Sequence, residues 1–308
     1  MVAYLLIRKI AQLFLMMALG FGLVKLKVLK AEESVVLSRL CLYLLMPCVI
    51  LNAFQVDYSE SLRDGILFAF AVAVVCYILL LVLDEVCKRT LKMDVVERAS
   101  VLYPNAANLI IPIVSSVLGP EWVVYTSAFV SVQQAFVWTQ GVKMFSDDGT
   151  FQWKKVFQNI NVIFICVGII LLVTGLRLPP ILSEVTESVG NMVGPVSMFV
   201  TGMLIAKMDV KRILSHKRVG LVVLLRMVAG PAVTLLLMKL SGAASLVENG
   251  SMILLVVFMA CCSPAAATVT QFSQIYNKDA EYAGAINILT TLVCIVTMPA
   301  FVFLYELF

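Results

Sequence analysis

Two segments of the sequence place prolines inside apolar stretches, where a continuous helix would otherwise be expected. The first covers residues 104–112 and carries Asn105 and Asn108 between its two prolines. The second is Ser263-Pro264, which follows Pro112 by about half of the chain length. A proline removes a backbone donor and clashes with the carbonyl four residues before it, so each segment is predicted to break a helix.

The chemistry that these segments offer is the binding of an anion. A broken helix presents an N-terminus with free N–H groups and a positive dipole, and the two asparagines add side-chain amides. A single proline kink or close packing through small residues would need no ligand. Paired breaks in equivalent helices, however, indicate the binding site of a transporter. We therefore predict substrate contacts from Asn105, Asn108, Pro112, Ser263 and Pro264.

Further polar residues recur at helical spacing in two other apolar stretches. Gln134 and Asn287 stand 153 residues apart, close to the spacing between Pro112 and Pro264. Both are predicted to face the broken helices, either to bind substrate or to form hydrogen bonds between helices. Arg226 is the one charge well inside an apolar stretch; its first interpretation is snorkelling to the interface, and its second is an ion pair with Asp84 or Glu85.

The elements that carry these residues are predicted to lie in a membrane. The chain of 308 residues is 61% hydrophobic and 14% charged, with a mean hydropathy of +1.00, whereas soluble domains carry roughly 25% charged residues. Continuous apolar runs without alternation favour helices over a barrel. The fold class is an all-α polytopic membrane protein with ten spans: 4–24, 34–54, 65–86, 97–118, 122–143, 157–177, 184–206, 218–240, 249–274 and 281–305.

Charges in the connecting loops predict the orientation of these spans. Seventeen Lys and Arg residues fall on one side and five on the other, so the first side is assigned to the cytoplasm and both termini to the outside. Five spans per half would make the halves inverted repeats, and Pro47 and Pro195 share nearly the same offset. We predict one membrane domain, 1–308, with repeats at 1–145 and 155–308 and with broken spans 4 and 9 crossing.

Several activities lack the residues that they require. The single histidine, His216, lies in a basic loop, and the sequence contains neither HExxH nor a P-loop. The eight cysteines have no CxxC spacing and are assigned to packing. We expect no enzyme activity, no cofactor, no metal site and no nucleic-acid partner.

Short motifs resemble the auxin efflux carrier family, which includes plant auxin carriers and bacterial organic-acid permeases. They are Pro104-Asn105 with Pro112, Leu45-Met46-Pro47, Ser263-Pro264-Ala265-Ala266-Ala267, Tyr276-Asn277-Lys278-Asp279-Ala280 and Thr297-Met298-Pro299. The resemblance implies a fold similar to bile-acid sodium symporters, with spans 1, 2, 6 and 7 as a scaffold. The other six spans would move, and the substrate carboxylate would sit at the crossing. Ile110 replaces a glycine that the family usually has.

We predict a secondary transporter of small organic anions in the plasma membrane, as in the inner membrane of a bacterium. The alternative is a channel-like or receptor-type membrane protein without a transport cycle. The coupling ion, proton or sodium, stays open, and a homodimer is compatible with the sequence.

Overall fold

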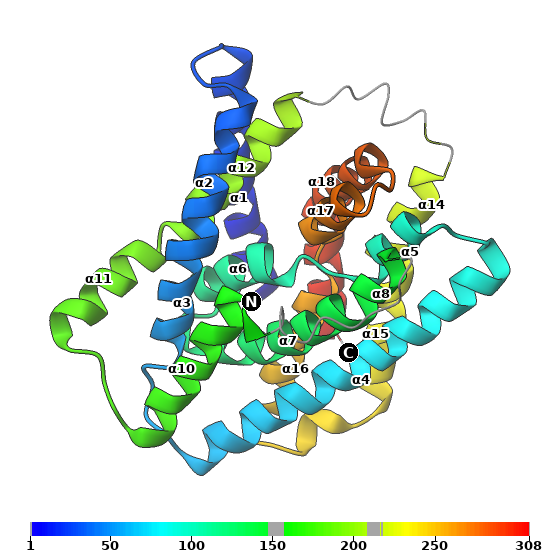
Figure 1. The fold of residues 1–308 in the computed structure, drawn as a ribbon. Coiled ribbons are helices and arrows are strands. Elements are labelled where there is room, and N and C mark those ends of the chain that lie inside the picture. Colours follow the sequence, from blue (N-terminus) through cyan, green and yellow to red (C-terminus); the bar gives the residue numbers. More distant parts are fainter. Residues whose placement is uncertain (1, 147–156, 208–215, 217, 308) are drawn as a thin grey trace.

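A computed structural model describes residues 2–146, 157–207, 216 and 218–307 (Figure 1). Over these ranges the chain is all-helical, and its only extended pairing is one isolated bridge. Five helical stretches are long and apolar enough to cross a membrane: Ala31–Ala53, Glu60–Leu91, Pro180–Ala206, Val219–Leu240 and Ala280–Leu307. Four shorter apolar helices accompany them: Ala11–Lys25, Ala106–Val117, Ile160–Thr174 and Gly250–Cys261.

The helices follow the predicted apolar stretches closely. The first half contains α1 (Val2–Lys25), η1 (Ala31–Glu33), α2 (Ser34–Leu40), η2 (Cys41–Leu45), α3 (Met46–Ala53), α4 (Glu60–Leu91), α5 (Val95–Leu102), η3 (Ala106–Ile110), α6 (Ile111–Val117), η4 (Pro120–Trp122), α7 (Val123–Phe136), η5 (Val137–Gly141) and α8 (Val142–Phe145). The second half contains α10 (Ile160–Thr174), α11 (Pro180–Gly190), α12 (Val193–Lys207), α14 (Val219–Leu224), η6 (Leu225–Ala229), α15 (Gly230–Leu240), η7 (Ala243–Ser245), α16 (Gly250–Cys261), α17 (Ala267–Ile275) and α18 (Ala280–Leu307).

Local side chains explain where several helices begin. Ser59 accepts a hydrogen bond from the Leu62 N–H at the start of α4, and Asn159 caps α10 in the same way. At α5, Asp94 accepts from the Glu97 N–H while Glu97 accepts from the Asp94 N–H, which is a capping box. These caps satisfy N–H groups that the first helical turn leaves without a partner.

Three π-helical turns end two residues before a proline. η2 precedes Pro47, η3 precedes Pro112 and η6 precedes Pro231. A proline cannot donate to the preceding turn and its ring crowds the carbonyl four residues back, and a wider turn relieves that crowding without ending the helix. Pro112 therefore lies inside a helix that continues from Ala106 to Val117. The sequence predicted that Pro112 breaks this helix, and that prediction is wrong.

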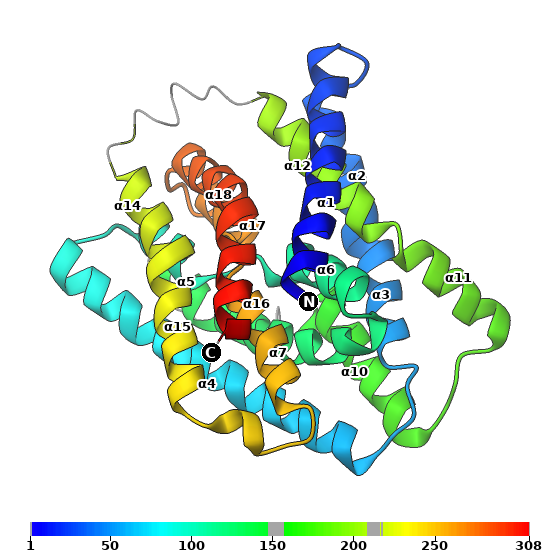
Figure 2. The same ribbon diagram turned by 180° about the vertical axis from the view of Figure 1, so that it is seen from behind.

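The helices form two groups, of which α1, α2 and α12 stand apart from α14, α17 and α18 in the views from both sides, with α6 and α7 in the middle (Figures 1 and 2). The scaffold group consists of α1, α2, η2, α3, α10, α11 and α12; α1 packs along α12, and α3 packs on α10 and α11. The crossing group consists of α4 to α8 and α14 to α18, in which α16 packs on α4, α7, α15 and α18. Contacts between the groups include α1 with α6 and α18, and α3 with α7.

Two glycines bring the backbones of α1 and α12 together. A Cβ on Gly202 would lie 1.9 Å from the Met17 carbonyl oxygen, and a Cβ on Gly20 would lie 2.5 Å from the Phe199 carbonyl oxygen. Any larger residue would force the helices apart. Small residues at helix contacts are typical of membrane proteins, where close van der Waals packing holds helices together.

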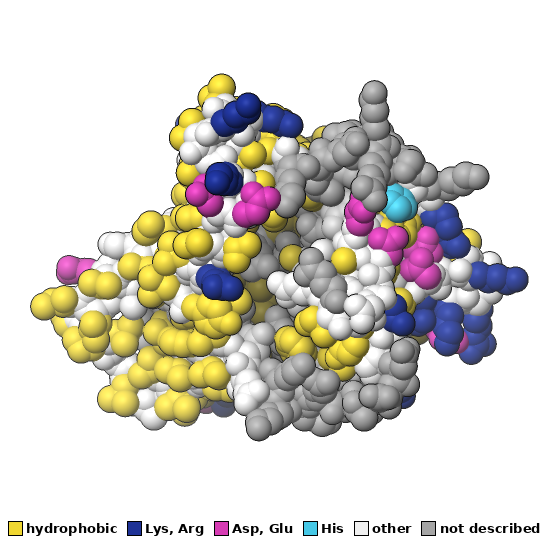
Figure 3. Space-filling view, turned by 45° about the horizontal axis from the view of Figure 1, so that its top comes forward, with side chains coloured by type: hydrophobic (Ala, Val, Ile, Leu, Met, Phe, Trp, Pro, Cys, Tyr) yellow, Lys and Arg dark blue, Asp and Glu magenta, His cyan; other side chains and the backbone are white. Residues whose placement is uncertain are grey.

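The outer surface is apolar in the way that lipid requires. On α4 the inward face is made of small or aromatic residues such as Ala69, Ala73 and Tyr77, all fully buried. The large aliphatic side chains of the same helix point outward: Leu67, Val74, Val75, Ile78 and Val82. Figure 3 shows a broad hydrophobic face on one side of the molecule, with Lys and Arg side chains gathered beyond its edges. A water-soluble monomer rarely exposes so wide an apolar surface.

Candidate functional site

Each of the two predicted breaks interrupts a helix just before a proline. Helix α5 ends at Leu102, and Tyr103 is extended with φ −100° and ψ 111° before Pro104. Helix α16 ends at Cys261, and the chain becomes helical again only at Ala267, after Ser263-Pro264. A residue that precedes proline is pushed out of the helical region, so both breaks have the same local cause. The structural counterpart of Pro264 is therefore Pro104, whereas the sequence paired Pro264 with Pro112.

The two broken segments meet and pair with each other. Pro104 and Ala265 form an isolated antiparallel bridge. The Asn105 N–H donates to the Pro264 carbonyl oxygen at 2.8 Å, and the Ala266 N–H donates to the Tyr103 carbonyl oxygen at 2.9 Å. Backbone groups freed by one break are thus satisfied by the other, as a low-dielectric interior demands. We call this pairing of residues 103–105 with 263–266 the crossing.

Side-chain amides from two neighbouring helices bind the carbonyls of the bridging residues. Gln133 of α7 donates through Nε2 to the Pro104 carbonyl oxygen. Asn287 of α18 donates through Nδ2 to the Ala265 carbonyl oxygen at 2.5 Å, as the prediction that it faces the broken helices requires. Thr290 accepts from the Ala265 N–H through Oγ1 at 3.1 Å. The bridge is therefore supported on both sides by buried or half-buried polar side chains.

Gln133 takes the place that the sequence assigned to Gln134. Gln134 instead accepts a hydrogen bond through Oε1 from Asn159 Nδ2 at 3.4 Å, at the start of α10. Adjacent residues point about 100° apart on a helix with 3.6 residues per turn, so a one-residue error changes the neighbour completely. The sequence named Gln134 for the crossing, whereas the hydrogen bond to the crossing comes from its neighbour Gln133.

Asn105 and Asn108 lie together at the open side of the crossing. Asn108 Nδ2 donates to Asn105 Oδ1 at 3.2 Å; Asn105 is half-buried and Asn108 is exposed. They stand at the start of the helix Ala106–Val117, while α17 begins at Ala267 across the bridge. First-turn N–H groups have no acceptor within their own helix. A helix N-terminus therefore follows each paired segment of the crossing, and the two carboxamides stand at the first of them.

Arg226 binds the opposite ends of the broken helices. Its Nε and Nη2 donate to the Ser263 carbonyl oxygen at 3.0 and 2.7 Å, Nη2 also donates to Cys261 at 2.9 Å, and Nη1 donates to Val101 at 3.1 Å. The side chain is 1% exposed, so it does not snorkel to the interface. A sequence does not reveal this role, because the partners are carbonyls that exist only once the helices are broken.

Asp84 pairs with Arg98, not with Arg226. Arg98 donates through Nε and Nη2 to the two carboxylate oxygens of Asp84 at 2.8 and 2.6 Å. This two-pronged contact ties the end of α4 to α5. Glu85, the other partner considered for Arg226, binds Arg89 at 2.7 Å on the exposed side of α4.

A second buried carboxylate was missed by the sequence. Glu97 of α5 forms an ion pair with Arg218 Nε at 3.1 Å and accepts a hydrogen bond from the Tyr282 hydroxyl at 3.1 Å, and its side chain is 3% exposed. His216 stacks on Tyr282 with ring centroids 4.6 Å apart. The capping-box spacing of Asp94 and Glu97 was the available signal, but it gave no hint of partners from α14 and α18.

Comparison with protein families identifies the family to which the chain belongs. A family model described as membrane transport protein matches residues 5–150 and again residues 148–302. The chain belongs to this family of membrane transporters, the auxin efflux carrier family. The expected family is therefore confirmed, and two successive matches cover nearly the whole chain. None of the curated proteins matches it significantly.

In this transporter a groove separates the two helix groups beside the crossing. Its cavity volume is about 20 Å³, and it is apolar except for Thr291. The lining side chains come from α1, η3, α6, α12 and α18: Leu13, Phe14, Leu109, Ile113, Met198, Thr291, Cys294, Ile295 and Met298. Leu109 directly follows Asn108 in the chain, but neither Asn105 nor Asn108 lines the groove.

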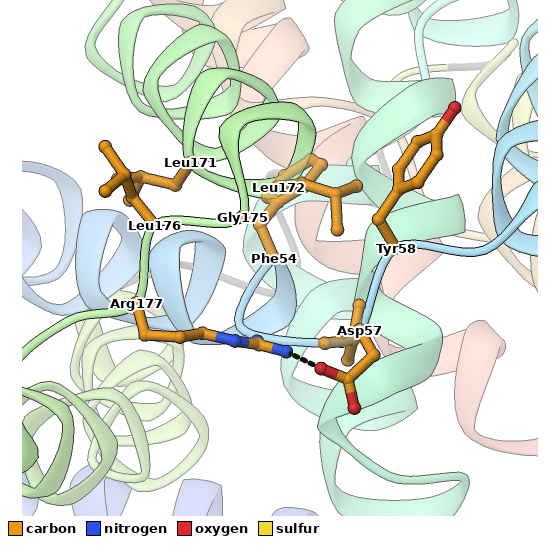
Figure 4. Close-up of a pocket in the computed structure, with 9 residues that line it drawn as sticks. Phe54, Asp57, Tyr58, Leu171, Leu172, Gly175, Leu176 and Arg177 are labelled. Atoms are coloured by element: carbon orange, nitrogen blue, oxygen red, sulfur yellow. Dashed lines mark hydrogen bonds and ion pairs between the residues drawn. The ribbon is translucent and has the colours of Figure 1, made fainter.

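A second small pocket of the transporter lies within the scaffold group, where α3 and α10 end (Figure 4). Arg177 and Asp57 form an ion pair at its rim, and Phe54 and Leu172 form its floor. None of the helices that adjoin the crossing lines this pocket, whereas η3 and α18, which do adjoin it, line the groove. We therefore assign the candidate site to the crossing and its groove.

Proposed function

We propose that this membrane transporter carries small organic anions by alternating access, with the substrate carboxylate at the crossing. The observation that carries the proposal is the pairing of two broken helices, with a helix N-terminus after each paired segment and with Asn105 and Asn108 at the first of them. Helix N-termini and carboxamide N–H groups are donors with positive partial charge, which suits a carboxylate. Ser263, Pro264, Gln133 and Asn287 support the backbone around the site.

The groove favours a substrate with an apolar body. A carboxylate bound near Asn108 would leave the rest of the molecule against Leu109 and the neighbouring aliphatic side chains. A second carboxylate would be desolvated there without a partner, at a cost of several kcal/mol. We infer that monocarboxylates with an aliphatic or aromatic body are better substrates than dicarboxylates of similar length.

Alternating access would move the crossing group against the scaffold group. The close glycine contacts between α1 and α12 support a scaffold that moves as one body. No pair of helices from the two different groups packs as extensively as α1 and α12 do within the scaffold group, and the apolar groove lies between the groups. Both features support a surface along which the two groups slide. Ten spans in two inverted repeats, 1–145 and 155–308, are part of this proposal, and the two family matches support the division into halves.

The cellular placement is part of the same proposal. Basic residues on one side of the spans favour a plasma-membrane protein with both termini outside. Cysteine labelling of intact cells after single cysteines are added near each terminus tests the orientation. Labelling by a membrane-impermeant maleimide is expected at both ends, and protection of either end contradicts the topology. A cysteine-free version of the chain provides the background.

Transport itself is tested by reconstitution into liposomes. Uptake of labelled monocarboxylates is expected to saturate with concentration, and added dicarboxylates of similar length are expected to compete weakly. Non-saturating flux would favour the channel-like alternative, and binding without flux would favour a receptor. Parallel assays with imposed sodium and proton gradients identify the coupling ion.

The site is tested by placing a negative charge at its open end. Asn108→Asp changes shape little but adds a carboxylate next to the bound anion. Like charges within about 5 Å repel by about 1 to 3 kcal/mol at intermediate dielectric, so uptake should fall at least about tenfold. Asn191→Asp is the matched control, because Asn191 is an exposed asparagine at the end of α11 in the scaffold group. Equal uptake by Asn108→Asp and Asn191→Asp would mean that the substrate carboxylate does not bind next to Asn108.

A further inference from the structure

The crossing brings together two helix C-termini as well as two N-termini. Helix α5 ends at Leu102 and α16 ends at Cys261, and the last carbonyls of each helix have no N–H partner further along it. These ends carry negative partial charge. In many transporters with broken helices, such carbonyls coordinate the coupling cation, a sodium ion or a proton, and transport then depends on that cation.

Here the carbonyls are already bound by a guanidinium group. The Arg226 side chain donates to Val101 at the end of α5 and to Cys261 and Ser263 at the end of α16, with all distances between 2.7 and 3.1 Å. One cation thus joins both negative ends. No ion pair within the described ranges of the chain involves Arg226, so the carbonyls alone compensate its charge.

Burial separates this role from direct binding of substrate. Arg226 is 1% exposed, and its Nε and both Nη atoms are engaged by backbone oxygens. It reaches the crossing from η6, a π-helical turn that precedes Gly230-Pro231. Such turns re-aim side chains and recur at functional sites. The helix Val219–Leu240 therefore delivers one positive charge to the C-terminal ends of α5 and α16.

We propose that Arg226 is a resident cation, which replaces the sodium ion that broken-helix carbonyls would otherwise bind. It keeps the two C-terminal ends together through the transport cycle, so the crossing needs no added cation to hold its shape. Because the negative ends are neutralised, the positive N-terminal ends at Asn105 and Asn108 dominate the field that a ligand meets. That last step rests on the proposed transport of anions; the replacement of sodium does not.

The first test uses the unaltered full-length protein. Purified protein is unfolded by heat in sodium chloride and in choline chloride of equal ionic strength. A ligand that binds only the folded state raises its melting temperature. We expect the same melting temperature in both salts, and a reproducible increase in sodium would overturn the proposal.

The second test removes the guanidinium and supplies it from solution. Arg226→Ala leaves a cavity and unpaired carbonyls, so its melting temperature should fall by several degrees, and millimolar guanidinium should restore part of the loss. Arg226→Met is the matched control, because its side chain fills the cavity; it should also be destabilised, but guanidinium should not restore it. Equal responses of the two variants to guanidinium would overturn the proposal.

A third variant covers the case in which these proteins do not fold. Arg226→Lys keeps a cation with three donors, so it should yield folded protein that remains insensitive to sodium. A folded lysine variant that gains stability in sodium would show that the carbonyls still bind that ion, against the proposal. Uptake assays separate this proposal from the proposed function. If guanidinium restores the stability of Arg226→Ala without sodium but the unaltered protein takes up no organic anion, only the proposed function is contradicted. If anion uptake requires sodium, only the role of Arg226 as a resident cation is contradicted.

Discussion

Helix α5, which leads into the first break, buries charged side chains, whereas helix α16, which leads into the second, contains none. Arg98 and Glu97 of α5 bind Asp84, Arg218 and Tyr282 on three other elements. In α16 every residue from Ile253 to Cys261 is at most 2% exposed and apolar. One broken helix is held by directional polar contacts and the other by packing.

The same difference continues into the breaks themselves. The first break carries Asn105 and Asn108, which are partly or fully open. The second carries Ala265 and Ala266, which are 1% and 2% exposed, and its polar atoms are used by Arg226, Asn287 and Thr290. Two helices with the same kind of break therefore need not share one function equally. We infer that the first break recognises the ligand and the second forms the packed surface against which it is held.

The largest effect on stability is expected from the charge pair of the first helix. Asp84→Asn leaves the Arg98 guanidinium, which is 17% exposed, without its carboxylate partner, and breaking a largely buried pair costs about 3–5 kcal/mol. The free energy of unfolding, measured with denaturing detergent, should fall accordingly. Asp64→Asn is the control, because the Arg63–Asp64 pair is exposed, and it should cost about 1 kcal/mol or less.

A double-mutant cycle decides which arginine is the partner of Asp84. The effects of Asp84→Asn and Arg98→Met should be strongly non-additive, because the two side chains bind each other. The effects of Asp84→Asn and Arg226→Met should add. Coupling to Arg226 in place of Arg98 would restore the pairing that the sequence suggested.

The second helix is expected to respond to shape rather than charge. Ala260→Leu adds three carbon atoms at a position that is fully buried in α16, and overpacking costs about 1–3 kcal/mol. Ser251→Leu in the first turn of the same helix places the same side chain at an exposed position and should leave the unfolding free energy nearly unchanged. If Ala260→Leu is as stable as Ser251→Leu, packing does not hold this helix.

Adjacent glutamines provide a smaller and more specific test of the crossing. Gln133→Ala removes the donor to the Pro104 carbonyl oxygen in a buried site, and an unsatisfied buried acceptor costs about 1–3 kcal/mol. Gln134→Ala removes only a long contact to Asn159 at 3.4 Å, and it should cost less than about 0.5 kcal/mol. If Gln134→Ala lowers the unfolding free energy more than Gln133→Ala does, Gln134 and not Gln133 supports the crossing.

The sequence predicted those parts of this arrangement that follow from local chemistry. Prolines in apolar runs located both breaks, and the polar residues of the last span identified Asn287 as a partner. What it missed depends on register and on backbone groups. The choice between Gln133 and Gln134 turns on one residue of helical phase. The partners of Arg226 are carbonyls, and no pattern of side chains marks them.

Pro112 shows the opposite kind of error. It matched an expected spacing and so was read as the cause of a break. The preceding π-helical turn, η3, allows the helix to continue through it, and the break lies at Pro104 instead. Whether a proline breaks a helix depends on whether the wider turn before it can form, which is a property of the surrounding packing.

The smallest effect on stability should accompany a large effect on function. Asn108 is exposed, and its hydrogen bond to Asn105 lies at the protein surface, so Asn108→Ala should change the unfolding free energy by no more than about 0.5 kcal/mol. Loss of a carboxamide donor to a charged ligand costs about 1.5–3 kcal/mol, so carboxylate affinity should fall about tenfold or more. Asn287→Ala, at the second break, should instead lower stability and leave the affinity of the folded fraction little changed. Calorimetric measurements of carboxylate binding and of unfolding in both variants test this contrast. If Asn108→Ala and Asn287→Ala lower the carboxylate affinity equally, the two breaks bind the substrate together.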